Sequence, residues 1–319
     1  MKEFNGKKGL QILNHSSFRL IKENIITKSK IKKFKFVYEP VIDLKIPFQY
    51  GIELEFVGVS RIEVENKLKQ FYQTKELIYG KTWFVDKDVS VTEGIYGGEL
   101  QSPISYNEEK DWTLLAQICK LVQQLGGFSN DKCSVHIHVD FRRLNFSMED
   151  WNRFLKLWCA YEDVIFKFSR VGQKNMRNCY FTFARPIKGY ILKVMSKGEA
   201  SDAITDPIGK LNKQSCLNMR NLYRSLSGMK TSISTIEIRS CNGTLNPIFI
   251  QNIVRVFSRL LETVNLKKEA LDPYIETRLY EKHPNYREKE LELSNLIFTN
   301  DFEKYSFLKQ CNMKVKRKD

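Results

Sequence analysis

The sequence lacks the patterns that mark membrane, secreted and zinc-ribbon proteins. No stretch approaches the roughly 20 consecutive apolar residues of a membrane-spanning helix. The N-terminus has no long apolar core, so we expect no signal peptide. Seven cysteines are scattered, odd in number and without Cys-x-x-Cys spacing, which favours reduced thiols over a disulfide scaffold. We therefore expect no membrane span and a reducing compartment, either the cytoplasm or an organelle matrix.

Histidine is also scarce, and its placement is informative. The chain has four histidines, and His136 and His138 both lie in the alternating stretch 133–140. Alternate side chains of a β-strand share a face, so both imidazoles point away from the hydrophobic residues between them. Two imidazoles about 7 Å apart on one face suit a metal ion or a phosphate. The alternative is a half-buried strand whose polar face happens to hold two histidines.

Two further stretches, 51–56 and 235–240, repeat this pattern of one apolar face and one ionisable face. Their ionisable residues are Glu53 and Glu55 in the first and Glu237 and Arg239 in the second. A single strand of this kind is usually a solvated sheet surface. Three together predict a sheet whose open face is the active site.

The overall composition is that of a globular protein with a strong positive charge. Hydrophobic residues are 42% and charged residues 28% of 319, and the net charge is +15. Residues 1–46 hold eleven Lys or Arg against four Asp or Glu, and the C-terminus is also Lys-rich. Such ends attract polyanions without specificity. The alternative is that they only keep the protein soluble. The remaining basicity could serve an anionic substrate such as a nucleotide.

The periodicity predicts an α+β fold with a mainly antiparallel sheet. One face of the sheet packs on helices, and the open face forms the active site. Strands are expected at 49–58 and 133–140, with a hairpin over 83–103. Helices are expected over 60–75, 108–125, 148–169 and 247–265. Residues 170–215 read as irregular, in the manner of a lid or binding loop.

We divide the chain into three segments by composition. Residues 1–45 form a basic N-terminal extension, and residues 46–272 form the catalytic domain. Residues 273–319 form a charged, mostly helical C-terminal appendage. The scattered cysteines are interpreted as buried hydrophobic residues rather than nucleophiles.

An ordered set of short motifs in this chain resembles the amidoligase family. These are ATP-dependent carboxylate–amine ligases of the glutamine synthetase and glutamate–cysteine ligase superfamily. The resemblance covers roughly residues 48–270, and the order and chemistry of the motifs together carry it. One departure is Ser134, where the family commonly has glycine. The motifs are Gly51-Ile52-Glu53-Leu54-Glu55, Asp88-Val89-Ser90, Glu99-Leu100-Gln101-Ser102-Pro103, Cys133-Ser134-Val135-His136-Ile137-His138-Val139-Asp140, Leu217-Asn218 and Thr235-Ile236-Glu237-Ile238-Arg239.

The resemblance implies a glutamine synthetase-like catalytic fold and a reaction that needs ATP and Mg²⁺ or Mn²⁺. A carboxylate substrate and an amine substrate, either a small molecule or a protein side chain, would form an amide or isopeptide bond through an acyl phosphate. By analogy the metal ligands are Glu53, Glu55, Glu99, His136 and Glu237. The resemblance also makes Arg239 and His138 contacts of the phosphate oxygens, and places Asp88 and Ser102 beside the incoming substrate, with Asp86 as an alternative to Asp88.

Other assignments stay open at this point. Arg170 and Arg177 could bind the acidic substrate or ATP phosphates, or be solvated surface residues, and Asn218 could contact substrate or only shape a turn. A second hypothesis is a catalytically inactive ligase fold that binds nucleic acid or an assembly through its basic ends. A third is a zinc hydrolase that uses the histidine pair. Active sites of the superfamily can lie between subunits, so a homo-oligomer is also open.

Overall fold

The computed structural model describes most of the chain, namely residues 28–91, 93, 95–171, 173, 176, 180–195, 205–281 and 285–313. Two compact units divide the chain, residues 1–35 and residues 36–319. In the first unit, helix α2 (Lys28–Lys33) ends in a turn rich in lysine. The second unit contains the sheet and is described from here on. Within the described residues, no helix combines the length and the apolar character that crossing a membrane requires.

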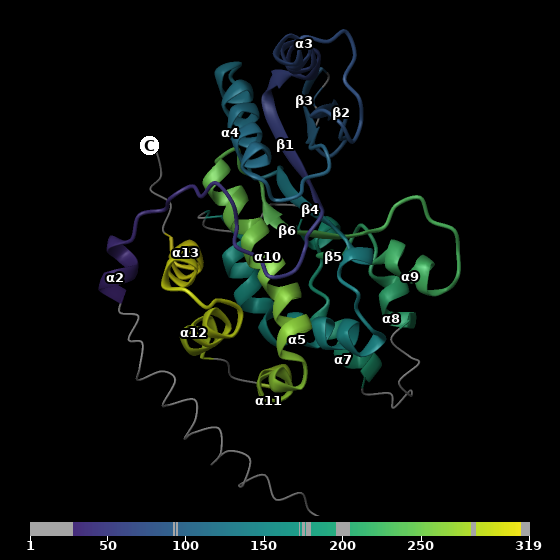
Figure 1. Ribbon diagram of the computed structural model, residues 1–319, viewed down its shortest axis with the longest axis vertical. Helices are drawn as coiled ribbons and strands as arrows, with labels where there is room; N and C mark the ends of the chain where they lie inside the picture. The colour runs from purple at the N-terminus through teal and green to yellow at the C-terminus, as the bar shows by residue number, and fades with distance from the viewer. Residues whose placement is uncertain are drawn as a thin grey trace, which may run out of the picture. The chain divides into compact units, whose positions relative to one another are not determined.

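The described strands form one six-stranded sheet, and every neighbouring pair is antiparallel (Figure 1). The strand order is β2-β3-β1-β4-β6-β5. The strands are β1 (Tyr50–Ser60), β2 (Phe84–Asp86), β3 (Tyr96–Gln101), β4 (Ser134–Asp140), β5 (Leu217–Asn218) and β6 (Thr235–Asn242). This sheet confirms the predicted α+β class and its antiparallel strands, including the β2–β3 hairpin. Its likeness to the glutamine synthetase fold stays a prediction.

Three long helices pack beside the apolar face of the sheet, as the sequence predicts. They are α4 (Glu109–Gln124), α5 (Met148–Ser169) and α10 (Pro247–Lys267). Trp112 of α4 stacks on Tyr50 of β1, and Trp158 of α5 stacks on Phe257 of α10. Burying such aromatic surface supplies much of the free energy that holds helices to a sheet.

The boundaries of these helices follow from local capping chemistry. Ser147 and Asp150 form the expected capping box at the start of α5. Asn246 accepts a hydrogen bond from the Ile248 amide, with Pro247 at the first helical position of α10. The shorter helices on either side are α3 (Arg61–Tyr72), η1 (Phe141–Arg143), α9 (Arg220–Leu226) and η3 (Lys268–Leu271).

The segment over 170–215 differs from the irregular structure that its sequence predicts. Its described parts include three short helices, α6 (Tyr180–Phe183), α7 (Lys188–Met195) and α8 (Thr205–Lys210). Glu162, from α5, accepts hydrogen bonds from the Ile187 and Lys188 amides at the start of α7. This cap comes from a residue 25 positions away in the sequence, so no local pattern could announce the helix.

The C-terminal helices share the hydrophobic core of the long ones. They are α11 (Asp272–Leu279), α12 (Tyr286–Ile297) and α13 (Asp301–Cys311). Phe307 of α13 is fully buried and stacks on Phe168 of α5. At the other end of the chain, Glu39 pairs with Arg255 of α10, and the Lys45 amide donates to Glu262. The boundaries proposed at residues 45 and 272 stay predictions.

A buried charge cluster ties α10 to α13 and leads to a stability prediction. The Arg259 guanidinium lies 3.0 Å from Glu303 and also pairs with Glu262, and all three side chains are buried. We expect Arg259→Ala to lower the free energy of unfolding by about 3–5 kcal/mol, because it leaves the buried Glu262 without its cation and Glu303 with only the more distant Arg255, 3.7 Å away. Urea unfolding followed by circular dichroism measures the loss.

The matched control is Lys69→Ala, which removes a cation from the surface pair between Lys69 and Glu65. Exposed pairs contribute little, so this variant should change the free energy of unfolding by less than about 1 kcal/mol. Equal losses in the two variants would contradict a special role for the buried cluster.

Candidate active site

The register of the sheet brings the predicted ionisable residues into adjacent rows on its polar face. Glu55 of β1 lies opposite Glu99 of β3, and Glu53 lies opposite His136 of β4. His138 lies opposite Glu237 of β6. Side chains at directly opposed positions are near enough to touch, so four separate sequence motifs meet in one cluster.

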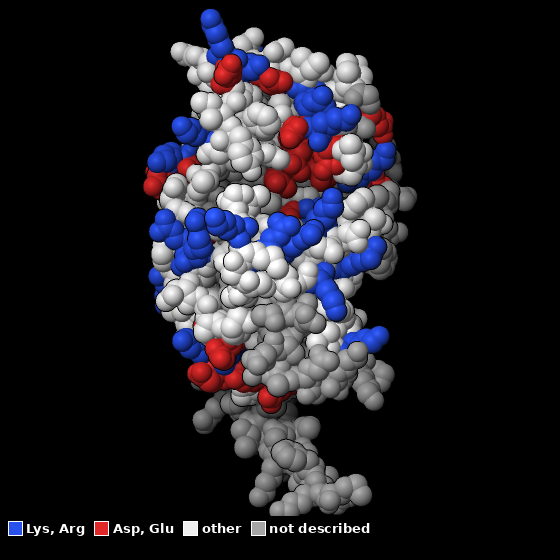
Figure 2. Space-filling view, turned by 90° about the vertical axis from the view of Figure 1, so that its right-hand side faces the viewer, with Lys and Arg blue, Asp and Glu red and all other residues white. Residues whose placement is uncertain are grey.

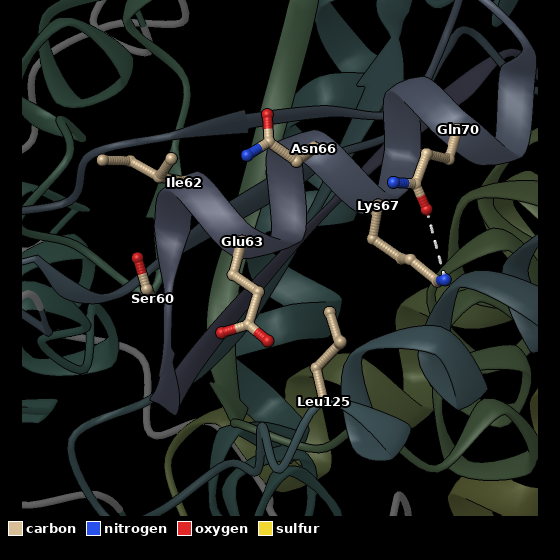
Figure 3. Close-up of a pocket in the computed structure, with 7 residues that line it drawn as sticks. All are labelled: Ser60, Ile62, Glu63, Asn66, Lys67, Gln70 and Leu125. Atoms are coloured by element: carbon tan, nitrogen blue, oxygen red, sulfur yellow. Dashed lines mark hydrogen bonds between the residues drawn. The ribbon is translucent and has the colours of Figure 1, made fainter.

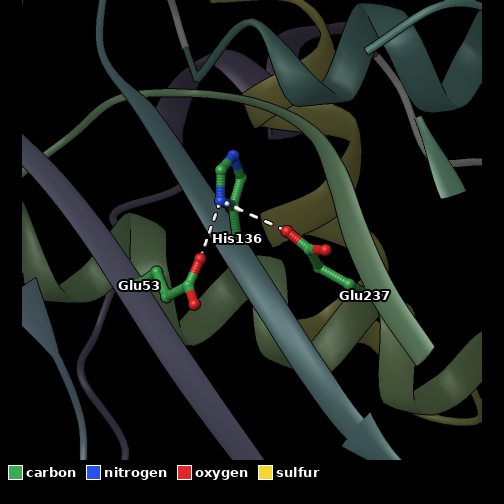
Figure 4. A group of neighbouring side chains, drawn as sticks. All are labelled: Glu53, His136 and Glu237. Atoms are coloured by element: carbon green, nitrogen blue, oxygen red, sulfur yellow. Dashed lines mark hydrogen bonds and ion pairs between the residues drawn. The ribbon is translucent and has the colours of Figure 1, made fainter. Parts of the chain in front are cut away.

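His136 is the centre of this cluster (Figure 4). Its Nδ1 atom lies 2.9 Å from Glu53 Oε2 and 3.5 Å from Glu237 Oε1. Its Nε2 atom lies 2.8 Å from Ser134 Oγ and 3.9 Å from Glu55 Oε1. The imidazole is only 2% exposed, so both ring nitrogens make their interactions away from bulk water.

A β-bulge lies opposite His136, next to Arg239. The register shifts between the pairs Val135–Cys241 and Ile137–Ile238, so Arg239 and the next residue of β6 face His136 together. Arg239 NH1 lies 3.5 Å from His136 Nδ1, and the same guanidinium pairs with Glu237. Arg239 is in register with His136 when the pairs are counted from Ile137–Ile238, so Ser240 is the extra residue of the bulge.

His138 and Asn218 complete the side of the cluster nearest β5. His138 Nε2 lies 3.0 Å from Glu53 Oε1 and 4.0 Å from Glu237 Oε1. The side-chain amide of Asn218 donates a hydrogen bond to Glu237 Oε2 at 2.8 Å. Asn218 therefore contacts a member of the cluster rather than only shaping a turn.

Glu99 and Glu55 form the other side of the cluster. The Ser134 amide donates to Glu55 Oε2 at 2.7 Å, and the Gln101 side chain donates to Glu99 Oε1 at 2.7 Å. Both carboxylates are buried. Burying two carboxylates so close together is costly unless a cation neutralises them.

Opposite charges decide the protonation of the β1–β4–β6 side. Burial raises the pKa of the Glu53 carboxyl, but His138 and His136 outweigh it and hold that pKa well below its usual range. The pKa of the Glu237 carboxyl shifts in the same direction. Burial raises it, but His138, His136 and Arg239 together bring it below the ordinary value. Burial lowers the pKa of His138, but the Glu53 carboxylate prevails and raises it to about 9.

Glu99 has the opposite shift. Burial, and after it the charge of Glu53, raises the pKa of the Glu99 carboxyl to about 8, although the hydrogen bond from Gln101 lowers it. The Glu99 carboxyl therefore holds a proton at neutral pH in the absence of a further cation.

The donor set of the cluster fits a hard divalent cation. In the part of the chain that the structure describes, two groups of three residues bring their ligand atoms within 4.8 Å of one another. The groups are Glu53, His136 and Glu237, and Glu55, Glu99 and His136. Carboxylate oxygens outnumber nitrogens in both, as Mg²⁺ and Mn²⁺ prefer, and the two histidines do not form a nitrogen-rich zinc site of their own.

The other predicted residues lie at the edge of the cluster or away from it. Asp88 is partly exposed in a turn, where its charge contributes to the raised pKa of Glu99. Ser102 accepts a hydrogen bond from the Ile52 amide, so it holds strand β1. Arg170 follows the end of α5 and lines a separate cavity. Arg177 lies outside the described residues.

Three contacts of the cluster come from residues that the sequence did not single out. Ser134 meets His136 Nε2, Gln101 meets Glu99, and Thr235 Oγ1 lies 3.4 Å from His138 Nδ1. Each lies two residues from a predicted ligand on the same strand. Alternation along the strand could have indicated them, because each is a polar residue on the same face as the predicted ligand.

A recess at the far end of β1 is unrelated to this cluster (Figure 3). It has a volume of about 500 Å³, and its described lining comes from the last residue of β1, from α3 and from the residue that follows α4. None of the cluster residues is among the described residues that line it. The lining residues are Ser60, Ile62, Glu63, Asn66, Lys67, Gln70 and Leu125. The recess is open and offers no convergent ligand set.

Comparison with protein families gives one match. The model of a family described as "Putative amidoligase enzyme" matches residues 80–261, which is more than half of the chain. The match includes β3, β4 and β6 and ends within α10. No curated protein matches the chain.

The raised pKa of Glu99 predicts that cation binding depends on pH. Below about pH 8 a divalent cation must displace the Glu99 proton in order to bind. The affinity of the protein for the cation should therefore rise by up to about tenfold per pH unit from pH ~6 to pH ~8. Loss of the positive charge of His138 acts in the same direction up to about pH 9. Titration with Mn²⁺, followed by electron paramagnetic resonance, measures the affinity.

Glu99→Gln is the matched variant, because it keeps the shape of the side chain and removes the titrating group. Its Mn²⁺ affinity should be weaker at high pH and should change less between about pH 6 and about pH 8. A wild-type affinity that is constant over this range would contradict the assignment of Glu99.

Proposed function

Because the chain belongs to the amidoligase family, we propose that it joins a carboxylate to an amine at the expense of ATP. One observation carries the proposal. A buried group of carboxylates and imidazoles, drawn from β1, β3, β4 and β6, lies beside an arginine on the polar face of the sheet. A cluster of this kind suits a metal-bound polyphosphate, whose charge must be neutralised during phosphoryl transfer.

The proposed reaction has two steps. An oxygen of the carboxylate substrate attacks the γ-phosphorus of ATP, and the bond to ADP breaks, which gives an acyl phosphate. The amine nitrogen then attacks the acyl carbon, phosphate leaves, and the nitrogen loses a proton. The product is an amide or isopeptide bond, lighter by one water than the two substrates together.

Each side chain of the cluster has a role in this scheme. Glu53, Glu55, Glu99, His136 and Glu237 would hold Mg²⁺ or Mn²⁺, and the cation would supply positive charge beside the phosphates. Arg239 and His138 would donate to the transferring phosphoryl group, because both present N–H groups on the same face.

The edge of the sheet near β2 and β3 suits the amine. Asp88 and Glu99 lie near each other there, and a protonated amine favours carboxylates around it. Figure 2 shows Asp and Glu side chains gathered in the upper part of one face, with Lys and Arg side chains below them. A face with both signs of charge accommodates a cationic amine and anionic phosphates together.

The first test is ADP release from Mg²⁺-ATP in a mixed pool of carboxylates and amines. Mass spectrometry of the same reactions would search for condensation products, lighter by one water. Turnover with such a product would establish the ligase and identify both substrates. A folded protein that binds no ATP would contradict the proposal and favour the inactive, basic binding module. Bound zinc with no dependence on ATP would favour the hydrolase.

Replacement of Glu237 tests the metal site. Glu237→Ala should abolish ADP release, by at least about a hundredfold, since it removes a carboxylate that lies within reach of His136, His138 and Arg239. Glu76→Ala, at an exposed position on the surface, is the control and should retain full activity. Unchanged ADP release from a folded Glu237→Ala protein would remove Glu237 from the site.

Replacement of Arg239 tests the role of its planar fork. Arg239→Lys keeps the charge but loses the paired donors, so kcat should fall by about 10²–10³ while the KM for ATP changes less. Steady-state kinetics at saturating substrates separates the two parameters. A rise in KM of similar size with unchanged kcat would mean that Arg239 binds the ground state and the transition state equally.

A further inference from the structure

A second cavity lies among the helices, apart from the ionisable cluster. It has a volume of about 530 Å³ and lies where α5, α7, α11 and α12 approach one another (Figure 1). Its described lining is Glu162, Asp163, Phe166, Lys167, Arg170, Met176, Pro186, Lys188, Glu281, Tyr286 and Lys289. None of these residues belongs to a strand of the sheet or to the ionisable cluster.

The acidic residues of this cavity already have hydrogen-bond or ion-pair partners. Glu162 accepts the Ile187 and Lys188 amides at the start of α7. Asp163 lies 2.6 Å from Lys289 Nζ, and Glu281 lies 3.0 Å from Arg278. Because these carboxylates already have partners, they have little capacity to bind a further cation in the cavity.

Two cations of the cavity form no ion pair among the described residues, although Lys188 lies near enough to Glu162 for its charge to lower the pKa of that carboxyl against the effect of burial. The guanidinium of Arg170 has a buried Nε that makes no hydrogen bond, and the ammonium of Lys188 makes no ion pair. Both side chains are partly exposed and line the cavity, so an anion there would gain a charged contact with each. The charge that remains to be matched in this cavity is positive.

The rest of the wall is apolar. Phe166 is buried in α5, and Met176, Pro186 and the ring of Tyr286 complete the hydrophobic surface. Cavities of this size that combine apolar walls with a few converging charged groups are typical of sites for small organic molecules.

We propose that this cavity binds a small organic anion that carries an apolar group. Arg170 and Lys188 contact its acidic group, and the apolar group packs on Phe166, Met176 and Pro186. Arg170, which the sequence associated with ATP phosphates, thereby serves a separate site. The proposal does not rest on the ligase reaction, because it uses none of the residues of the ionisable cluster.

The test uses the full chain and the fluorescent probe 8-anilinonaphthalene-1-sulfonate, an aromatic anion. We expect saturable binding with one site per chain, weakened at least about tenfold by Arg170→Gln and by Lys188→Gln, since each loses a charged contact. Lys156→Gln is the matched control, because it removes one charge from the same helix α5 at a position outside the cavity lining. Glu237→Ala should bind the probe normally.

Two competitors define the site further. Methanesulfonate, which keeps the acidic group and lacks the rings, should displace the probe only at concentrations at least about tenfold higher than a naphthalenesulfonate does. Mg²⁺-ATP should not displace it. Displacement by Mg²⁺-ATP would make the cavity part of the nucleotide site and overturn the proposal. So would equal probe binding by wild type and both cavity variants, once circular dichroism has shown that all are folded.

Discussion

The burial of charge on the polar face of the sheet is the constraint on which this structure depends. Glu53, Glu55, Glu99 and Glu237 approach two imidazoles and one guanidinium within a few ångströms. Carboxylates leave water only when opposite charge replaces its stabilisation. His138 and Arg239 supply it for Glu53 and Glu237, whereas Glu99 receives less and keeps a proton. The unbalanced negative charge that remains is what a divalent cation would neutralise.

The helical layers hold this face in place. The apolar side of the strands needs a complete hydrophobic cover, and α4, α5 and α10 supply it, with contacts such as the stacking of Trp112 of α4 on Tyr50 of β1. The C-terminal helices and residues 38–46 in turn cover α5 and α10 through Phe307 and the buried pairs of Arg255 and Arg259. Rigid backing of this kind keeps the ionisable side chains at fixed separations, which a site of several ligands requires.

Much of the fold could be predicted because its signals are local. The period-two pattern of residues 51–56, 133–140 and 235–240 specified the three central strands, and capping residues such as Ser147 and Asn246 fixed helix starts. The short helices between residues 180 and 210 could not be predicted in this way. The cap of α7 comes from Glu162 on another helix, so its stability depends on a contact that forms only in the folded chain.

The sequence by itself determined which residue types would share a face, because alternation along a strand is a property of the backbone. It thereby paired Glu53 with Glu55, His136 with His138 and Glu237 with Arg239, each pair on the polar face of its own strand. Only the tertiary structure decided the register between strands, which sets Arg239 beside His136, and the placement of Arg170 in a cavity among helices. Register and bulges depend on which strands pair and how side chains pack between them, and those contacts join residues up to 103 positions apart in the chain.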